Sequence, residues 1–363
     1  MRPVHDGTVR CSTIDVACGS RIQTRKFVHQ NVPVPWNLLV ASRRRQLRAS
    51  SLSYVPPQTL DPRVTERRNP RTVNVDLAAP EAIVDLMHAE DRLVADAVAS
   101  QREMIARTIS AVETAFRGGH RLFYIGAGTS GRLGVLDASE CPPTFGTEPG
   151  MVIGLIAGGD RALRTPIEGA EDDANGGIAA LREHALGAGD VVVGIAASGT
   201  TPYVRGALAY ARSVRAITAL IACSEPPAAM RDVCDILMLP IVGPELLTGS
   251  TRLKAGTATK LVCNMITTGA MIRIGKSYGN LMVDLRATNE KLTDRAERIM
   301  MEVAGIAREE AREWLARADG AVKLAIVMQA LGVDASTARA RLAEAGGVIR
   351  RVVPDGPPAM PAT

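Results

Sequence analysis

A glycine-rich loop follows a short apolar segment near residue 122 and constrains the fold more than any other feature. Residues 122–126 read Leu-Phe-Tyr-Ile-Gly, and residues 126–131, here called the first loop, read Gly-Ala-Gly-Thr-Ser-Gly before an expected helix. Glycines allow a sharp turn and a close approach to a ligand. The first amides of the helix offer free N–H groups and a partial positive charge. This pattern predicts a binding site for an anion, and a phosphate fits it best.

A second loop with hydroxyl side chains follows another apolar segment. Residues 190–196 read Asp-Val-Val-Val-Gly-Ile-Ala, and residues 197–202, here called the second loop, read Ala-Ser-Gly-Thr-Thr-Pro before an expected helix. The carboxyl ends of parallel strands meet at one sheet edge, so both loops can converge on one phosphate. Helix capping is the alternative interpretation of these hydroxyls. The candidate ligand contacts are Gly128, Thr129, Ser130, Ser198, Gly199 and Thr200.

Strand-like and helix-like segments alternate through the middle of the chain. Strands are expected at 121–126, 151–157, 190–196, 215–222 and 235–239. Helical periodicity covers 80–117 and 250–274, and three short helical segments are expected at 294–317, 319–331 and 334–345. This order predicts an α/β fold with a doubly wound, parallel, five-stranded sheet flanked by helices, followed by a small C-terminal three-helix unit.

The charge is distributed unevenly along the chain. Of the net charge of +5, residues 1–60 carry nine Lys or Arg against two Asp, whereas the remainder has 34 basic and 36 acidic residues. Residues 1–60 are expected to be a disordered arm or a start assigned too far upstream, with an organelle-type leader as the alternative. Residues 61–120 should form N-terminal helices, and 354–363 a disordered tail. The basic arm lacks interleaved aromatic residues, so we expect no binding of nucleic acid.

The remaining composition narrows the class of protein further. No apolar run approaches the roughly 18 residues of a membrane span, and the start lacks the apolar stretch of a secretion signal. We therefore expect a cytoplasmic protein without a membrane partner. The six cysteines include no C-x-x-C pair, which argues against a zinc site or a disulfide framework.

Longer motifs give the chain a specific resemblance. They lie at 126–132, at 136–144 (Leu-Asp-Ala-Ser-Glu-Cys-Pro-Pro-Thr), at 167–172 and at 243–257, and residues 65–70 (Thr-Glu-Arg-Arg-Asn-Pro) match the usual start. From about residue 61 to about 353 the chain resembles the N-acetylmuramic acid 6-phosphate etherases, a family with a sugar isomerase (SIS) domain. The resemblance implies a SIS domain over 121–291, a helical, UBA-like unit over 292–353, a homodimer, and no metal or cofactor.

The resemblance also implies a reaction and its carboxylates. The substrate would be a phosphosugar whose D-lactyl ether is removed by elimination followed by hydration, giving N-acetylglucosamine 6-phosphate and D-lactate. Glu140 and Glu171 match the family's acid/base pair, with Glu140 as the proton donor to lactate. A straight helix would place Glu140 about 15 Å from Ser130, at roughly 1.5 Å per residue. Either that helix is broken early, or Glu140 serves the site of a neighbouring subunit.

Other interpretations stay open at this point. A phosphosugar isomerase or a sugar-phosphate-sensing regulator could share the fold. Glucokinase-regulating proteins, for example, share the Thr-Gly-Ser-Thr-Arg motif. The first loop alone also fits the dinucleotide pattern G-x-G-x-x-G, with Asp160 as the residue for the ribose. Four further residues are either substrate contacts or ordinary helix-end residues: Glu245, Arg252, Lys254 and Lys323.

Overall fold

The computed structural model describes residues 61–285 and 290–357. The expectations for the arm at 1–60 and for the end of the tail at 358–363 lie outside the described residues.

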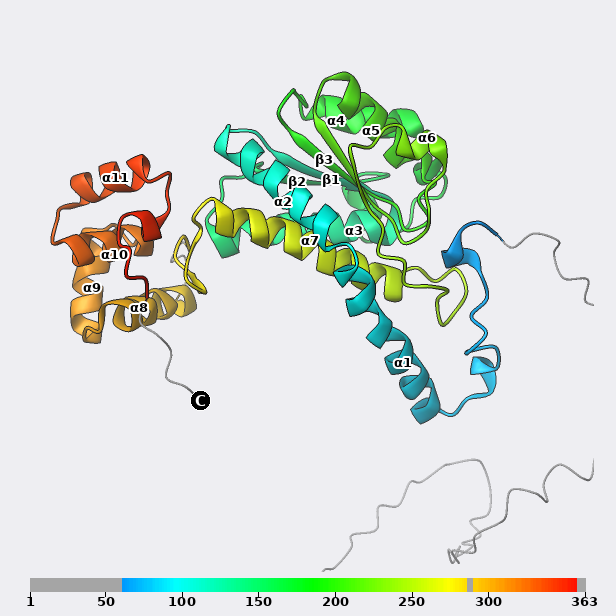
Figure 1. Cartoon of the computed structure of the whole chain (residues 1–363), viewed down its shortest axis with the longest axis horizontal. Coiled ribbons are helices and arrows are strands. Elements are labelled where there is room, and N and C mark those ends of the chain that lie inside the picture. Colours follow the sequence, from blue (N-terminus) through cyan, green and yellow to red (C-terminus); the bar gives the residue numbers. More distant parts are fainter. Residues whose placement is uncertain (1–60, 286–289, 358–363) are drawn as a thin grey trace, which may run out of the picture. The chain divides into compact units, whose positions relative to one another are not determined.

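A five-stranded parallel sheet forms the centre of the segment expected to be a SIS domain (Figure 1). Its strand order is β2-β1-β3-β4-β5, and every neighbouring pair is parallel. β1 and β3 are buried on both faces, as expected for apolar runs in the middle of a parallel sheet. The five expected strands are confirmed, each slightly shorter than the predicted range. They are Leu122–Gly126 (β1), Val152–Ile156 (β2), Val191–Ile195 (β3), Ile217–Ile221 (β4) and Ile236–Met238 (β5).

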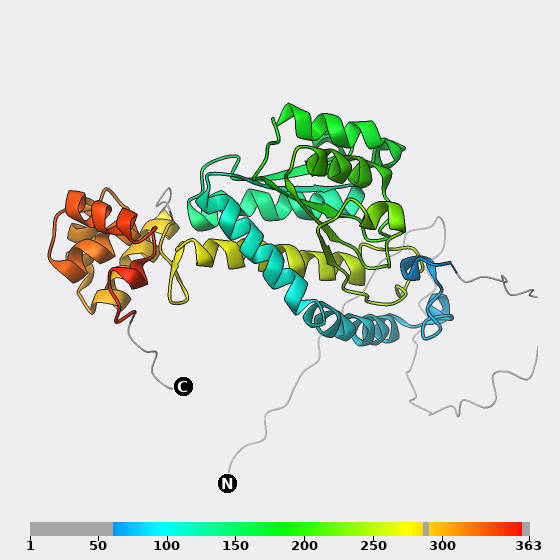
Figure 2. The same ribbon diagram turned by 45° about the horizontal axis from the view of Figure 1, so that its top comes forward.

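Helices cover both faces of this sheet, and the alternation of side chains along β1 divides the core between them. Leu122 and Tyr124 pack in the cluster formed with α1, α2, α3 and α7. Phe123 and Ile125 pack on the opposite face, with α4, α5 and α6 (Figure 2). This arrangement confirms the doubly wound fold. The helices are Pro80–Ala99 (α1), Arg102–Arg117 (α2), Gly128–Phe145 (α3), Ala174–Glu183 (α4), Pro202–Ser213 (α5), Ala228–Arg231 (α6) and Lys254–Arg273 (α7).

The order of the strands reverses beside β1, and this places the two glycine loops together. The chain passes from β1 outward to β2 and then returns across β1 to β3, so β1 lies between them. The last residues of β1 and β3, Gly126 and Ile195, are direct neighbours in the register. The first and second loops therefore leave the same edge of the sheet side by side, where open α/β sheets bind ligands.

The C-terminal unit has its own hydrophobic core and differs from the expected three helices. A short hairpin, Ser277–Tyr278 (β6) with Leu281–Met282 (β7), precedes it. The segment expected as one helix at 294–317 is two helices, because Gly305 adopts a left-handed φ of 66° and ends the first of them. The described part of this unit thus contains four α-helices and one short 3-10 helix: Glu290–Ala304 (α8), Arg308–Arg317 (α9), Val322–Leu331 (α10), Ala335–Glu344 (α11) and Ile349–Arg351 (η5).

Candidate active site

The first loop brings the N-terminus of α3 close to the end of β1. A Cβ atom on Gly131 would lie 2.6 Å from Cγ1 of Ile156 and 2.7 Å from the carbonyl oxygen of Gly126, so only glycine fits there. Gly128 has a φ of 53°. No side chain of the described residues caps α3 at Ala127, which leaves the capping interpretation of Thr129 and Ser130 without support. The first amides of the helix are thus available to an anion.

The second loop is arranged in a similar way at the start of α5. The hydroxyls of Ser198 and Thr200 lie 2.9 Å apart, and the amide of Thr200 donates to Oγ of Ser198 at 3.3 Å. Gly199 has a φ of 73° and packs against Pro226. Among the described side chains, none caps α5 at Thr201. Two helix N-termini and several hydroxyls therefore meet at one sheet edge.

A cavity of about 400 Å³ lies at this edge. Five of the six predicted ligand contacts line it, together with the predicted catalytic residue Glu171; Gly199 lies between two of the lining residues. The cavity is lined by Arg63, Glu66, Ala127, Gly128, Thr129, Ser130, Glu171, Asp172, Ala197, Ser198, Thr200, Thr201, Pro202 and Thr251.

Glu171 reaches this cavity from a short 3-10 helix. It lies in Ala170–Asp172 (η4), which packs against α5, and both Glu171 and its neighbour Asp172 are exposed. The structure therefore places one of the two predicted acid/base carboxylates at the rim of the cavity.

Glu140 lies outside this cavity. α3 runs without interruption from Gly128 to Phe145 and includes Pro142 and Pro143, so the helix is not broken early. Glu140 is exposed on it, and Leu136, one turn earlier, is 50% exposed. An early break of the helix therefore does not explain the distance of Glu140 from Ser130.

The N-terminal segment, residues 61–77, contributes two lining residues to which sequence reasoning gave no role, Arg63 and Glu66. The segment is fixed by Thr65, whose amide donates to Oγ of Ser224 at 3.3 Å. Asn69 donates its side-chain amide to the carbonyl of Pro244 at 3.2 Å. The available signal was the motif at residues 65–70, which supported the resemblance but suggested no chemistry.

A buried chain of charges joins this segment to the start of α7. The ammonium of Lys254 donates to Glu90 at 2.6 Å, and Arg71 donates to both oxygens of the same carboxylate at 2.6 and 2.8 Å. Lys254 is 1% and Glu90 2% exposed. Burial alone would raise the pKa of Glu90, but the hydrogen bonds from Arg71 and Lys254 lower it to about 2. We call Arg71, Glu90 and Lys254 the ion chain.

The other three open candidates are also placed by the structure. Glu245 is fully buried and accepts the amides of Lys254 and Ala255 at 3.0 and 2.9 Å, so it caps α7. Burial raises its pKa, against the effect of these two amides. Arg252 is exposed and does not line the cavity, and Lys323 donates to Asp284 at 2.8 Å. Lys254, through its ion pair with Glu90, thus fits the interpretation of a salt-bridged helix start, and Glu245 stabilises the same helix start through backbone amides.

The charged residues that line the cavity are mostly acidic. Glu66, Glu171 and Asp172 bring carboxylates, and Arg63 is the single Lys or Arg among the described lining residues. Arg63 donates two side-chain hydrogen bonds to Asp61, at 3.0 and 2.7 Å. A phosphate would be held by amide and hydroxyl groups rather than by cations. The carboxylates can then contact the uncharged part of a ligand.

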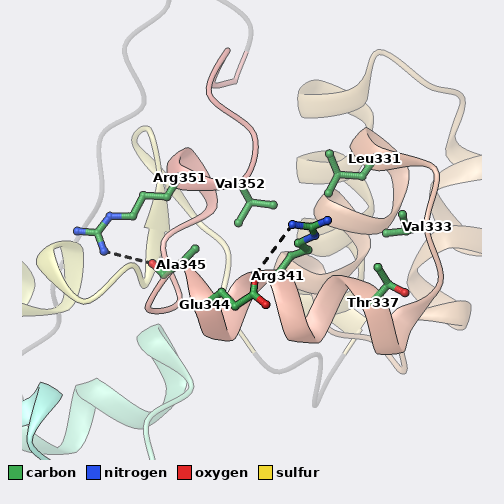
Figure 3. A pocket seen from close by; sticks show the side chains of 8 residues that line it. All are labelled: Leu331, Val333, Thr337, Arg341, Glu344, Ala345, Arg351 and Val352. Carbon is green, nitrogen blue, oxygen red and sulfur yellow. Dashed lines mark hydrogen bonds and ion pairs between the residues drawn. The ribbon is translucent and has the colours of Figure 1, made fainter.

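Another cavity, of about 650 Å³, lies in the C-terminal unit (Figure 3). It contains none of the predicted site residues, and its guanidinium and carboxylate groups include the ion pair of Arg341 with Glu344, at 4.0 Å. Within residues 61–285 and 290–357, no group of three or more His, Cys, Asp or Glu side chains could hold a metal ion. The helices in those ranges are too short or too polar to cross a membrane.

Parts of the chain are similar to known proteins. The family model for the N-terminal SIS domain of glucokinase regulatory protein matches residues 104–212. A phosphoheptose isomerase structure from Neisseria gonorrhoeae covers 52% of this chain and 98% of its own, at 17% identity and a TM-score of 0.37.

Curated relatives match most of the chain. An N-acetylmuramic acid 6-phosphate etherase from Brucella anthropi is 54% identical over 294 residues, which cover 81% of this chain and 95% of the relative. One from Aliivibrio fischeri is 50% identical over 292 residues, or 80% of this chain and 97% of the relative. The chain therefore belongs to the N-acetylmuramic acid 6-phosphate etherase family.

Proposed function

We propose that this protein is a carbon–oxygen lyase that removes the D-lactyl group from N-acetylmuramic acid 6-phosphate in the recycling of cell-wall amino sugars. The observation that carries the proposal is the cavity in which two helix N-termini, two hydroxyl-bearing loops and Glu171 meet. The names of its relatives support the choice of substrate.

The two loops bind the phosphate in this proposal. Amides at the start of α3 and the hydroxyls of Thr129 and Ser130 donate from one side, and Ser198 and Thr200 donate from the other. Each helix adds a partial positive charge of about half a unit at its N-terminus. The sugar then extends from the phosphate toward the carboxylates of the cavity.

The elimination needs two proton transfers at neighbouring carbons. In the open-chain aldehyde the proton on carbon 2 is acidified by the carbonyl, and a base removes it. The bond between carbon 3 and the lactyl oxygen then breaks, and an acid protonates the departing lactate. Water adds to carbon 3 of the unsaturated intermediate while a proton returns to carbon 2. Well-placed carboxylates contribute about 10²–10⁴ to the rate of such transfers.

We assign these transfers to Glu171 and to Glu140 of a second copy of the chain. Glu140 is exposed outside the cavity of its own chain, and the exposed Leu136 one turn away offers apolar surface for contact between copies. A homodimer with two-fold symmetry would give each site one carboxylate from each copy. Glu140 donates the proton to lactate, and Glu171 is the second acid/base group.

The test uses the purified full chain, the muramic acid phosphate and water enriched in heavy oxygen. Mass analysis of both products should show the label in the sugar at carbon 3 and none introduced into lactate. Label in lactate would mean that a different bond is broken. A phosphosugar isomerase or a sugar-phosphate-sensing regulator would release no lactate at all.

The shared site has its own test. Glu140→Gln and Glu171→Gln should each be inactive and folded. When the two variants are mixed and allowed to exchange subunits, half of the dimers are mixed and each of these has one intact site. Activity should therefore return to about a quarter of the wild-type value. No recovery after subunit exchange would contradict the assignment of Glu140 to the partner's site.

A further inference from the structure

One step of the proposed reaction has no residue assigned to it. A hexosamine phosphate exists mainly as a ring, and elimination requires the open-chain aldehyde. Ring opening moves a proton from the hydroxyl on carbon 1 and delivers a proton to the ring oxygen. These two atoms are different from carbon 2 and the lactyl oxygen, at which Glu140 and Glu171 are proposed to act. A further acid/base group in the site would serve this step.

Glu66 is the carboxylate that the structure fixes most firmly in the cavity. Three carboxylates line the described cavity, and Glu171 and Asp172 are exposed on η4, whereas Glu66 is half-buried. It belongs to Val64–Glu66 (η1) and so comes from a different element of the chain. A carboxylate on a fixed element can hold the geometry that proton transfer requires.

The neighbours of Glu66 determine where its carboxylate lies. Thr65 is fully buried, and its amide and hydroxyl lie 3.3 Å from Oγ of Ser224, which is also fully buried. The hydroxyl of Thr65 is 3.5 Å from one oxygen of Glu66. The other oxygen lies beside Gly249, 3.5 Å from the position that a Cβ atom would take there. The carboxylate therefore lies against the loop that leads to Thr251, another lining residue.

The ion chain holds these two segments together. Arg71 belongs to the N-terminal segment and Lys254 to the start of α7, and both bind the carboxylate of Glu90. Thr72 adds a 2.7 Å hydrogen bond to the carbonyl of Leu246. Glu66 and the loop at residues 246–253 are thus anchored as one wall of the cavity.

Glu66 is also available to a ligand. Within residues 61–285 and 290–357 it forms no ion pair within 4.0 Å. The guanidinium of Arg63, whose charge interacts with Glu66 at longer range, binds Asp61. The carboxylate of Glu66 can therefore accept a hydrogen bond from a sugar hydroxyl without first giving up a cation.

We propose that Glu66 opens the sugar ring, an inference that rests on the proposed function. Glu66 accepts the proton of the hydroxyl on carbon 1, the carbonyl forms, and the bond between carbon 1 and the ring oxygen breaks with its electron pair on that oxygen. The protonated Glu66 returns a proton to the ring oxygen. The net change is the isomerisation of a hemiacetal to a hydroxyaldehyde, and no other reactant is needed.

The test measures ring opening apart from elimination. The protein is incubated with N-acetylglucosamine 6-phosphate, and exchange between the two anomers is followed by nuclear magnetic resonance. Wild type should accelerate the exchange, and Glu66→Gln should reduce this acceleration by about 10² or more, within the usual range for acid/base groups. Glu66→Asp should recover part of it.

Two controls separate chemistry from folding. Glu103→Gln makes the same change at an exposed position on α2 and should behave as wild type. Inorganic phosphate should inhibit wild type and Glu66→Gln with the same constant, which shows that the phosphate loops are intact.

The possible results are all decisive. The proposal is wrong if wild type does not accelerate the exchange, or if Glu66→Gln accelerates it as well as wild type does. Lactate release by wild type with normal exchange by Glu66→Gln would reject the role of Glu66 and leave the proposed function standing. Exchange that depends on Glu66, without lactate release by wild type, would reject the proposed function and keep the role of Glu66.

Discussion

The substitution Lys254→Met tests whether the ion chain fixes the wall of the cavity. In the wild type, the Lys254 ammonium and the Arg71 guanidinium share the buried carboxylate of Glu90. Methionine has a similar length and no charge, so the substitution leaves Glu90 in the interior with one charged partner in place of two. Arg71 is 58% exposed at its side chain and so shields the carboxylate only in part.

Two estimates give the expected loss in the free energy of unfolding. Removal of one member of a buried pair costs roughly 3–5 kcal/mol, and the remaining contact with Arg71 favours the lower end. The lowering of the pKa of Glu90 from 4.5 to about 2 corresponds to about 3 kcal/mol, which is the net effect of its hydrogen bonds and neighbouring charges after the cost of burial. We therefore expect Lys254→Met to lower the free energy of unfolding by about 2–3 kcal/mol.

Urea unfolding followed by circular dichroism measures this loss. With a slope of about 3 kcal/mol per molar urea, the midpoint should fall by about 1 M. Lys260→Met, at an exposed position on the same helix, should leave the midpoint within about 0.2 M. The double variant Lys254→Met with Glu90→Leu should be more stable than the single variant, because it leaves no buried charge without its partner. An unchanged midpoint for Lys254→Met, or an additive double variant, would refute the role of the ion chain.

Two further predictions concern the first loop and the pH dependence of stability. Gly131→Ala should destabilise the fold by about 1–3 kcal/mol, because its Cβ would overlap Ile156 and the carbonyl of Gly126. Gly187→Ala is the control, because there is open space around the Cβ at that position, and it should not destabilise the fold. Equal melting temperatures of the two variants would contradict this prediction. The pKa of Glu90 is lower in the folded than in the unfolded protein. Its contribution to the free energy of unfolding is therefore complete above pH 4.5 and is lost as the pH falls toward 2. In Glu90→Gln, urea midpoints measured across this range should depend less on pH than in wild type, and an equal dependence would exclude Glu90 as a cause.

Local sequence signals were sufficient for the sheet and for the ligand loops. Each strand lies within a short apolar run, and the first and second loops follow β1 and β3, which are neighbours at the point where the strand order reverses. The C-terminal unit shows the limit of periodicity. Apolar spacing continues through residues 304–308, but Gly305 takes a left-handed conformation that ends α8, and the pattern alone does not show that turn.

The site was less predictable where it depends on contacts between distant residues. Glu66 reaches the cavity because Thr65 binds Ser224, 159 residues later in the chain, and because Lys254 pairs with Glu90, 164 residues away. No local pattern encodes such pairings. The distance of Glu140 from the first loop was predictable from the rise of a helix, but the site that we propose for it belongs to another copy of the chain. Single-chain periodicity carries no information on that contact.

The central claim is that the first and second loops hold one phosphate with the sugar directed at carboxylates. A crystal structure of this protein with bound N-acetylglucosamine 6-phosphate tests it most directly. We predict the phosphate within hydrogen-bond distance of the amides at residues 128–130 and of the hydroxyls of Ser198 and Thr200, with the sugar facing Glu66 and Glu171. A phosphate bound elsewhere, with these two loops empty, would contradict the account.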